Sequence, residues 1–274
     1  DKPLIIINES MQFSAGVNLS YTMDFADKGE FKSIEKFIKY FQETCKHLKY
    51  SKYPVVSAPS GLTLGGGFEV LVQSNFVASH TNLVVGLVET IVGLIPAGGG
   101  CKEMLIKAFS NVQDKTDLIE KYTEVLDVFT TLALGTVSKD AQDAKNIGYL
   151  NSSDIIIESS NLIEFAKQKV LDLSIEPYST TFNNSIPVLG SEIRERLIDE
   201  IPRIFGSNHP TKYDIEIVSK LAYIITGGNG ALGKLESEQY FLDLEKEVVL
   251  HLCGNEKTAG RISHILTTGK PLRN

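Results

Sequence analysis

The chain has little of what disulfide frameworks and metal sites require. Its 274 residues include three cysteines, Cys45, Cys101 and Cys253, which form no CxxC pair. An odd number of scattered cysteines is typical of reduced thiols in a cytoplasmic protein. The five histidines show no ligand spacing such as HExxH, so no metal site is expected. The absence of GxSxG and of a P-loop removes the commonest serine hydrolases and phosphate-transfer enzymes from consideration.

Long apolar runs and an excess of positive charge are also missing. No segment approaches the roughly 20 apolar residues that cross a membrane, and no charged-then-apolar leader opens the chain. The net charge of -7 and the pI near 5.4 argue against nucleic acid as a partner, because phosphate binding usually leaves a basic footprint. With 42% hydrophobic and 22% charged residues, the chain is long enough for one large domain, or a core with a smaller helical part.

The first hundred residues alternate between expected strands and helices. Periodicity predicts a helix at 34–50, with Phe37, Phe41, Cys45 and Leu48 on one face. Short β-rich runs predict strands at 4–8 and 54–59 and a hairpin formed by 76–80 and 82–87.

From about residue 100 the pattern becomes helical. Helices are predicted at 100–109, 115–134, 138–147, 160–173, 188–200, 213–226, 235–252 and 256–267. Ser138 is the expected start of one of them, and Gly148 is its expected end. We predict a core at 1–155 and a helical C-terminal region at 156–274, joined through the loose segment 174–187.

Three glycine clusters stand out: Phe-Ser-Ala-Gly-Val-Asn at 13–18, Leu-Gly-Gly-Gly-Phe-Glu at 64–69 and Pro-Ala-Gly-Gly-Gly-Cys at 96–101. Consecutive glycines let backbone N–H groups converge on a developing negative charge. One such cluster alone is more typical of a tight turn, but three within ninety residues, with acids nearby, favour a ligand site. A GxGxxG match at 228–233 follows a helical pattern rather than a strand, which predicts a loop between helices instead of a dinucleotide site.

Four motifs resemble the crotonase family of enoyl-CoA hydratases and isomerases. The stretch 53–69 reads YPVVSAPSGLTLGGGFE, and the family writes its end as ALGGGCE. The stretches VGLVE at 85–89 and GLIPAGGG at 93–100 resemble FGxPE and GxxPGxGG. FSAGVN at 13–18 resembles FCAGAD, and TVSKDAQDAKNIG at 136–148 resembles a family helix. The resemblance covers about residues 3–155. It implies an α/β fold, the crotonase (ClpP-like) spiral of ββα units, here with a helical C-terminal region.

The resemblance also implies an active site. The backbone N–H groups of Val17 and Gly66 would form an oxyanion hole. Two glutamates would share the chemistry, with Glu69 chiefly activating water and Glu89 chiefly protonating Cα. CoA and substrate would contact Phe13, Ser14, Ala15, Gly16, Leu64, Gly65 and Gly67. Two departures from the family pattern are Val17 in place of alanine and Asn18 in place of aspartate.

The activity implied is hydration of a 2-enoyl-CoA to a 3-hydroxyacyl-CoA in fatty-acid β-oxidation. Two alternatives remain: an enoyl-CoA isomerase, which needs one acid at the Glu89 position, and a catalytically silent acyl-CoA-binding scaffold. A glutamate in the first turn of a helix is often only a favourable dipole contact, so either acid alone would decide nothing. The presence of both glutamates at motif positions favours the hydratase.

The remainder of the chain resembles the C-terminal part of bacterial bifunctional proteins that carry a 3-hydroxyacyl-CoA dehydrogenase before the hydratase. The chain opens directly on an expected strand, so we expect the first ββα unit and the dehydrogenase to lie upstream. No cofactor is expected in this chain, because CoA is part of the substrate, and NAD would be needed only by such a dehydrogenase. We expect a cytoplasmic protein that forms a homo-oligomer or packs on a dehydrogenase domain. Lys270 and Arg273 either contact a CoA phosphate or form a solvated basic tail.

Overall fold

The computed structural model describes residues 2–111, 118–158, 161–175 and 185–274. Its contacts group the chain into two compact units, each assembled from three segments. Unit 1 comprises Asp1–Val17, Phe41–Leu87 and Val137–Asn183, and unit 2 comprises Asn18–Tyr40, Val88–Thr136 and Asn184–Asn274. This grouping does not follow the predicted boundary at residue 155, because residues on either side of it occur in both units.

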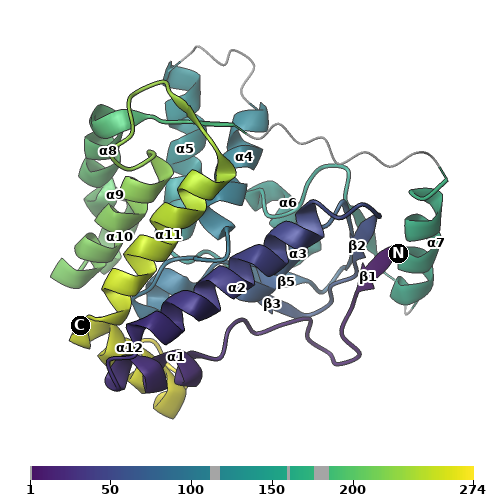
Figure 1. Ribbon diagram of the computed structural model, residues 1–274, viewed down its shortest axis with the longest axis horizontal. Helices are drawn as coiled ribbons and strands as arrows, with labels where there is room; N and C mark the ends of the chain where they lie inside the picture. Colours follow the sequence, from purple (N-terminus) through teal and green to yellow (C-terminus); the bar gives the residue numbers. More distant parts are fainter. Residues whose placement is uncertain (1, 112–117, 159–160, 176–184) are drawn as a thin grey trace. The chain divides into compact units, whose positions relative to one another are not determined.

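Unit 1 consists of short parallel strands and helices (Figure 1). Its strands are β1 (Leu4–Ile6), β2 (Val55–Ser57), β3 (Leu62–Leu64), β4 (Phe76–His80), β5 (Val84–Gly86) and β6 (Ile155–Ile157). Its helices are α3 (Gly66–Leu71), α6 (Ala141–Ile147), α7 (Leu162–Asp172) and the second part of α2 (Phe31–Lys49). Four strands form a sheet in the order β1-β2-β4-β6, and β3 pairs with β5 in a second sheet.

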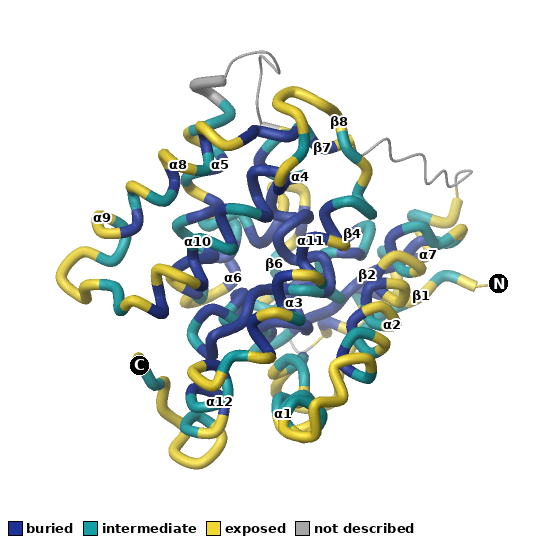
Figure 2. Tube along the Cα trace, turned by 60° about the vertical axis from the view of Figure 1, so that its left-hand side comes forward, coloured by how far each residue is buried: buried dark blue, intermediate teal, exposed yellow. Residues whose placement is uncertain are grey.

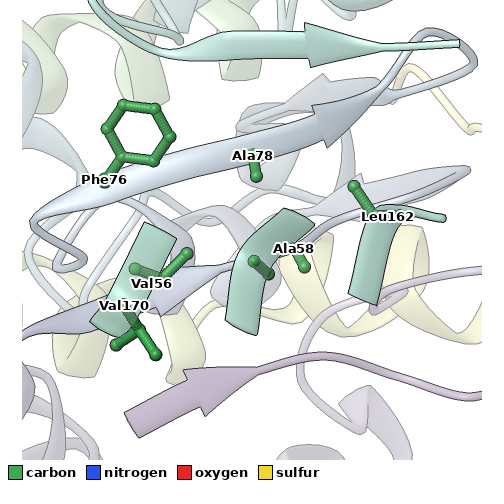
Figure 3. Packing of buried hydrophobic residues seen from close by; sticks show 7 residues of the cluster. Val56, Ala58, Phe76, Ala78, Leu162 and Val170 are labelled. Atoms are coloured by element: carbon green, nitrogen blue, oxygen red, sulfur yellow. The ribbon is translucent and has the colours of Figure 1, made fainter. Parts of the chain in front are cut away.

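A hydrophobic core lies where α7 packs on β1, β2 and β4. Its helical members, Leu162, Ala166 and Val170, recur every four residues and therefore share one face of α7. Figure 3 shows this face against the side chains of the sheet. The sheet contributes four buried residues: Val56, Ala58, Phe76 and Ala78. This packing holds the sheet in place, and the loops and helices of unit 1 are connected to its strands.

The predicted hairpin of 76–80 and 82–87 is wrong. Strands β4 and β5 lie at these positions, but β4 pairs with β2 and β6 whereas β5 pairs with β3. Between them the Leu83 N–H donates to the His80 carbonyl at 3.1 Å. The turn sends the chain out of one sheet and into the other, although strands adjacent in sequence are more often neighbours in one sheet.

Unit 2 is largely helical. It contains α1 (Leu19–Asp27), the first part of α2, the 3₁₀ helix η1 (Glu89–Val92), α4 (Gly100–Asn111), α5 (Leu118–Ala133), α8 (Gly190–Asp199), α9 (Ile201–Phe205), the 3₁₀ helix η2 (Gly206–Asn208), α10 (Lys212–Ile225), α11 (Glu238–Cys253) and α12 (Glu256–Thr268). Strands β7 (Ile186–Pro187) and β8 (Leu235–Glu236) form an antiparallel pair. Figure 2 shows α10 and α11 largely buried, and α10 packs on α4, α5, α8 and α11.

The predicted helices after residue 100 are confirmed where the structure describes them, with shifts of a few residues at their ends. The start of α6 shows the reason for one such shift. Asp140 caps it by accepting from the Asp143 N–H, while Ser138 instead exchanges hydrogen bonds with Val85. Gly148 ends the helix with a φ of 93°, as predicted. The predicted start of the helix at 115–134 and most of the segment 174–187 lie outside the described residues.

Cys45, Cys101 and Cys253 are all free and buried. Burial raises the pKa of the Cys253 thiol to about 12, so this side chain stays protonated at neutral pH. Among the helices of the described ranges, none combines the length and the apolar character that a membrane crossing requires.

Candidate active site

The first glycine cluster is fastened beside the strand that leads into the second one. The Ser14 N–H donates to the Leu62 carbonyl at 3.0 Å, and the Leu64 N–H donates to the Ser14 carbonyl at 2.9 Å. These bonds form an isolated parallel bridge between Ser14 and Thr63 of β3. Phe13 is buried. The loop Phe13–Val17 therefore runs next to the start of α3.

Glycine allows this loop and the start of α3 to meet. Gly16 has a φ of 94°, and a Cβ there would lie 3.1 Å from the Leu64 oxygen. A Cβ on Gly67 would lie 2.6 Å from the Cβ of Ser14. A Cβ on Gly66 would lie 3.0 Å from Cγ2 of Val17 and 3.3 Å from the Phe41 ring. The structure thus brings together the predicted CoA-binding and oxyanion-hole residues, all within unit 1.

Two backbone N–H groups at this junction have no acceptor within the described ranges. Gly65, with a φ of 52°, donates its N–H to the Gly86 carbonyl at 2.9 Å and turns the chain into α3. The next N–H, that of Gly66, begins the helix, and neither it nor the Val17 N–H has a protein acceptor there. Because most backbone donors in a fold are paired, two unpaired ones at the same junction are suited to an oxyanion.

Glu69 lies in the first turn of α3 and is 3% exposed. Its N–H donates to the Gly65 carbonyl at 3.1 Å, which fixes the residue one turn after the glycines. Its own carbonyl accepts from the Gln73 side chain at 3.0 Å and from the Cys45 thiol at 3.7 Å. A carboxyl group at such a depth is shielded from bulk water, as an acid–base group requires.

Glu89 begins η1 and belongs to unit 2. The residue is half-buried, and its Oε2 is shielded from solvent. The Leu94 N–H donates to its carbonyl at 3.0 Å, and Gly93, with a φ of 83°, ends the turn. The structure thus places Glu69 and Glu89 in different units, and their action as a pair stays a prediction.

Comparisons with known proteins show what this chain is similar to. Residues 3–108 match the family model described as enoyl-CoA hydratase/isomerase. The structure resembles that of an enoyl-CoA hydratase from Rhodobacter sphaeroides, with a TM-score of 0.66 at 18% identity over 99% of this chain and 78% of that one. The chain has the crotonase fold.

The relatives of this chain include longer proteins. It is 34% identical over its whole length to a Bacillus subtilis protein named as a 3-hydroxyacyl-CoA dehydrogenase, of which it covers 34%. It is 28% identical, over 97% of its length, to a Rickettsia felis protein named as a fatty acid oxidation complex trifunctional enzyme, of which it covers 33%. The chain therefore spans about a third of the length of these relatives.

The third glycine cluster has an internal partner. The carboxylate of Glu245, from α11, accepts the Gly99 N–H at 2.8 Å and the Lys102 N–H at 2.9 Å. Glu245 is fully buried. The expectation that this cluster helps to hold a ligand is therefore not met at these two donors, which a side chain of the protein already occupies.

A buried cation accompanies that carboxylate. The Lys102 ammonium forms ion pairs with Glu103 and with Glu238, the latter at 2.7 Å. Burial alone would lower the pKa of Lys102, but these two carboxylates outweigh it and raise the pKa above its usual range. The start of α4 is thus a charged structural network.

Two smaller predictions also have an outcome. The GxGxxG stretch 228–233 is a loop, as predicted, between α10 and β8. Arg273 is exposed, and it forms an ion pair with Asp214 at 2.6 Å and donates to the carbonyls of Asn208 and His209. Asn18, noted as a departure from the family pattern, caps α1 by accepting from the Ser20 N–H at 3.1 Å.

Proposed function

We propose that this chain is an enoyl-CoA hydratase that uses Glu69 and Glu89 as its acid–base pair. The observation that carries the proposal is the junction in unit 1, where the N–H groups of Val17 and Gly66 have no acceptor in the described protein and Glu69 is buried one turn further along α3. The match of residues 3–108 to the enoyl-CoA hydratase/isomerase model supports the choice of a CoA thioester as the substrate.

In the proposed reaction, Glu69 accepts a proton from water, and the water oxygen forms a bond to Cβ of the enoyl group. The π electrons move toward the thioester, whose oxygen becomes an enolate. The two N–H groups stabilise this oxygen, and loss of one such donor typically lowers the rate about 10²–10³-fold.

Glu89 then completes the addition by giving its proton to Cα, which yields the 3-hydroxyacyl-CoA. Each turnover leaves Glu69 protonated and Glu89 ionised, so a proton must exchange with water before the next one. Two carboxyl groups that share one water would titrate as a coupled pair. The pH profile of the rate would then belong to the pair and to neither residue alone.

The test is the loss of the conjugated-enoyl absorbance of crotonyl-CoA, followed with the parent, Glu69→Gln and Glu89→Gln. We expect each variant to be slower by about 10²–10⁴-fold, the usual range for an acid–base group. Circular dichroism melting of each variant controls for folding. A folded parent that hydrates neither crotonyl-CoA nor longer 2-enoyl-CoAs, in the protein as its gene encodes it, would contradict the proposal.

The same variants separate the alternatives. An isomerase would convert 3-enoyl-CoA to 2-enoyl-CoA and would lose this activity in Glu89→Gln while keeping most of it in Glu69→Gln. A silent scaffold would bind acyl-CoA without converting either substrate. Glu69 is retained and buried, which supports the hydratase over an enzyme that needs one acid.

The proposal extends to the longer protein that the relatives suggest. We propose that a 3-hydroxyacyl-CoA dehydrogenase, with NAD as its cofactor, accompanies this chain in a cytoplasmic fatty-acid β-oxidation enzyme, and that the chain packs on that domain or on a second copy. NADH formation from crotonyl-CoA by the whole gene product would support the coupling, and hydration without NADH formation would contradict it.

A further inference from the structure

The turn that carries Glu89 is held by side chains near the end of the chain. α12 packs directly on η1, and both belong to unit 2. A Cβ on Gly93, the residue that ends this turn, would lie 2.8 Å from Oγ1 of Thr258 and 3.3 Å from Cδ of Arg261. The approach of α12 to the turn is therefore as close as glycine permits.

Thr258 connects this turn to α10 through two hydrogen bonds. Its Oγ1 lies 2.7 Å from the Gly93 carbonyl oxygen and 2.5 Å from the Tyr213 hydroxyl. A carbonyl can only accept, and a hydroxyl has one hydrogen, so Thr258 donates to Gly93 and accepts from Tyr213. Thr258 and Tyr213 are fully buried, and burial raises the pKa of Tyr213, which keeps its donor proton in place.

Arg261 provides a second attachment one turn further along α12. Its guanidinium reaches the Thr90 carbonyl at 3.5 Å and forms an ion pair with Asp214 at 2.7 Å. Asp214 also accepts from the Thr211 N–H at 2.8 Å and from Arg273. Arg261 is 2% exposed, so this planar donor group is fixed on several sides.

Thr90 is fixed from the opposite direction as well. Its hydroxyl donates to the Leu132 carbonyl at 3.0 Å, at the end of α5. The two carbonyls bound by α12, those of Thr90 and Gly93, lie one and four residues after Glu89. The backbone next to this acid is thus tied to α5, α10 and α12 by buried polar contacts.

We propose that Thr258 and Arg261 are positioning residues for Glu89, through the backbone of η1. The inference rests on the proposed function, because the position of Glu89 matters only if this acid delivers a proton to Cα. Thr258 contributes the direct hydroxyl bond to the turn, and Arg261 contributes a charged donor that is itself held by Asp214. A misplacement of a reacting group by about 1 Å lowers rates by about 10²-fold, so small movements of this turn are consequential.

The decisive variant is Thr258→Val, which keeps the shape of the side chain and removes its hydroxyl. In the protein as its gene encodes it, we expect kcat for crotonyl-CoA hydration to fall about 10–100-fold, with KM within about twofold of the parent. Thr258→Ser restores the hydroxyl and should recover most of kcat. Thr268→Val is the matched control on the same helix and is expected to leave both constants unchanged. Its exposed hydroxyl bonds to nearby backbone, namely the carbonyls of His264 and Lys270 and the Lys270 N–H.

A second readout does not depend on catalysis. The N–H groups of Gly93 and Leu94 bond to carbonyls within the turn, and their exchange with deuterated solvent reports its opening. We expect Thr258→Val, and not Thr268→Val, to accelerate exchange in the peptide that covers 89–94. Unchanged exchange, or a fall in kcat that Thr258→Ser does not rescue, would overturn the positioning role. Accelerated exchange in a protein that hydrates no enoyl-CoA would instead count against the proposed function while leaving the attachment of the turn in place.

Discussion

The starts of α3 and α4 look alike in sequence and differ in use. Each follows a run of glycines, and each presents backbone N–H groups that its own helix cannot satisfy. At α3, in unit 1, the Gly66 N–H and the neighbouring Val17 N–H have no acceptor in the described protein. At α4, in unit 2, Glu245 accepts two such groups. The difference lies in whether the fold supplies its own carboxylate.

This comparison shows how a glycine-rich helix start can be assigned. Consecutive glycines permit a close approach, but they do not say what approaches. At α4 the answer comes from a residue 146 positions away from Gly99 in the chain. At α3 the close contacts come from Ser14 and from the Val17 side chain, and among the described residues neither accepts the Gly66 N–H. We therefore interpret the start of α4 as a structural cap and the start of α3 as a ligand site.

The largest expected effect tests the structural cap. Glu245→Ala removes the acceptor of two buried N–H groups, and each buried donor left unsatisfied costs about 1–3 kcal/mol. We expect the free energy of unfolding, from urea denaturation, to fall by about 2–5 kcal/mol. Glu247→Ala, on the same helix and exposed, is the matched control and should be near neutral. A stable Glu245→Ala protein that had lost activity would reverse our assignment of this helix start.

A smaller effect separates the two helix starts directly. In Gly66→Ala the new methyl group would press on Val17 and Phe41, so we expect kcat for hydration to fall about 10-fold or more, as for a slightly misplaced reacting group. Gly99→Ala places a side chain at a φ of 112° and should instead lower stability by about 1–2 kcal/mol. Steady-state kinetics and urea titration of both variants would show whether Gly66→Ala lowers kcat and Gly99→Ala lowers stability. Loss of activity from Gly99→Ala alone, without loss of stability, would contradict it.

The smallest effect concerns α10, whose start is capped by local residues. Thr211 and Asp214 form a capping box there. Burial alone would raise the pKa of Asp214, but hydrogen bonds from Arg273, the Thr211 N–H and Arg261 outweigh it and lower the pKa. A lowered pKa in the folded state stabilises the protein above the unfolded value, near 3.8, and this contribution disappears as the pH falls through the folded value.

The measurement is the difference in unfolding free energy between the parent and Asp214→Asn as a function of pH. We expect a constant difference of about 0.5–1.5 kcal/mol from pH 5 to 8, the net contribution of a typical hydrogen bond. It should shrink as the pH falls below about 4, where the unfolded aspartate becomes protonated. A difference that stays constant into strong acid would mean that the charge of Asp214 contributes nothing.

Much of the helical part could be predicted because its apolar residues are regularly spaced. In α10, Ile217, Leu221 and Ile225 lie on one buried face, as periodicity indicated. α1 was missed, since it has no fully buried residue, although Asn18 is a capping signal that could have revealed it. The three-residue strands β3 and β6 were also missed, whereas β1, β2 and β5, which are equally short, lie within the predicted β-rich runs.

The candidate site also has residues that the sequence predicted and residues that it did not. The motifs located Gly66, Glu69 and Val17, because backbone approach and helix position follow from nearby residues. They gave no sign of Thr258 or Arg261, which contact the Glu89 turn from more than 160 positions away. Partners at such separations depend on the whole arrangement of unit 2, and no local pattern encodes them. Glu245 was missed for the same reason.

The attachment of the Glu89 turn also sets an order of events during synthesis. Gly93 emerges from the ribosome 165 residues before Thr258, and Thr90 emerges 171 residues before Arg261. At roughly 5–20 residues per second, the turn exists for about 10–30 s before its partners are made. Glu89 can therefore be fixed in place only after α12 has been translated. A nascent chain that stops before α12 has every glycine motif and both glutamates, but it lacks the contacts that hold this turn.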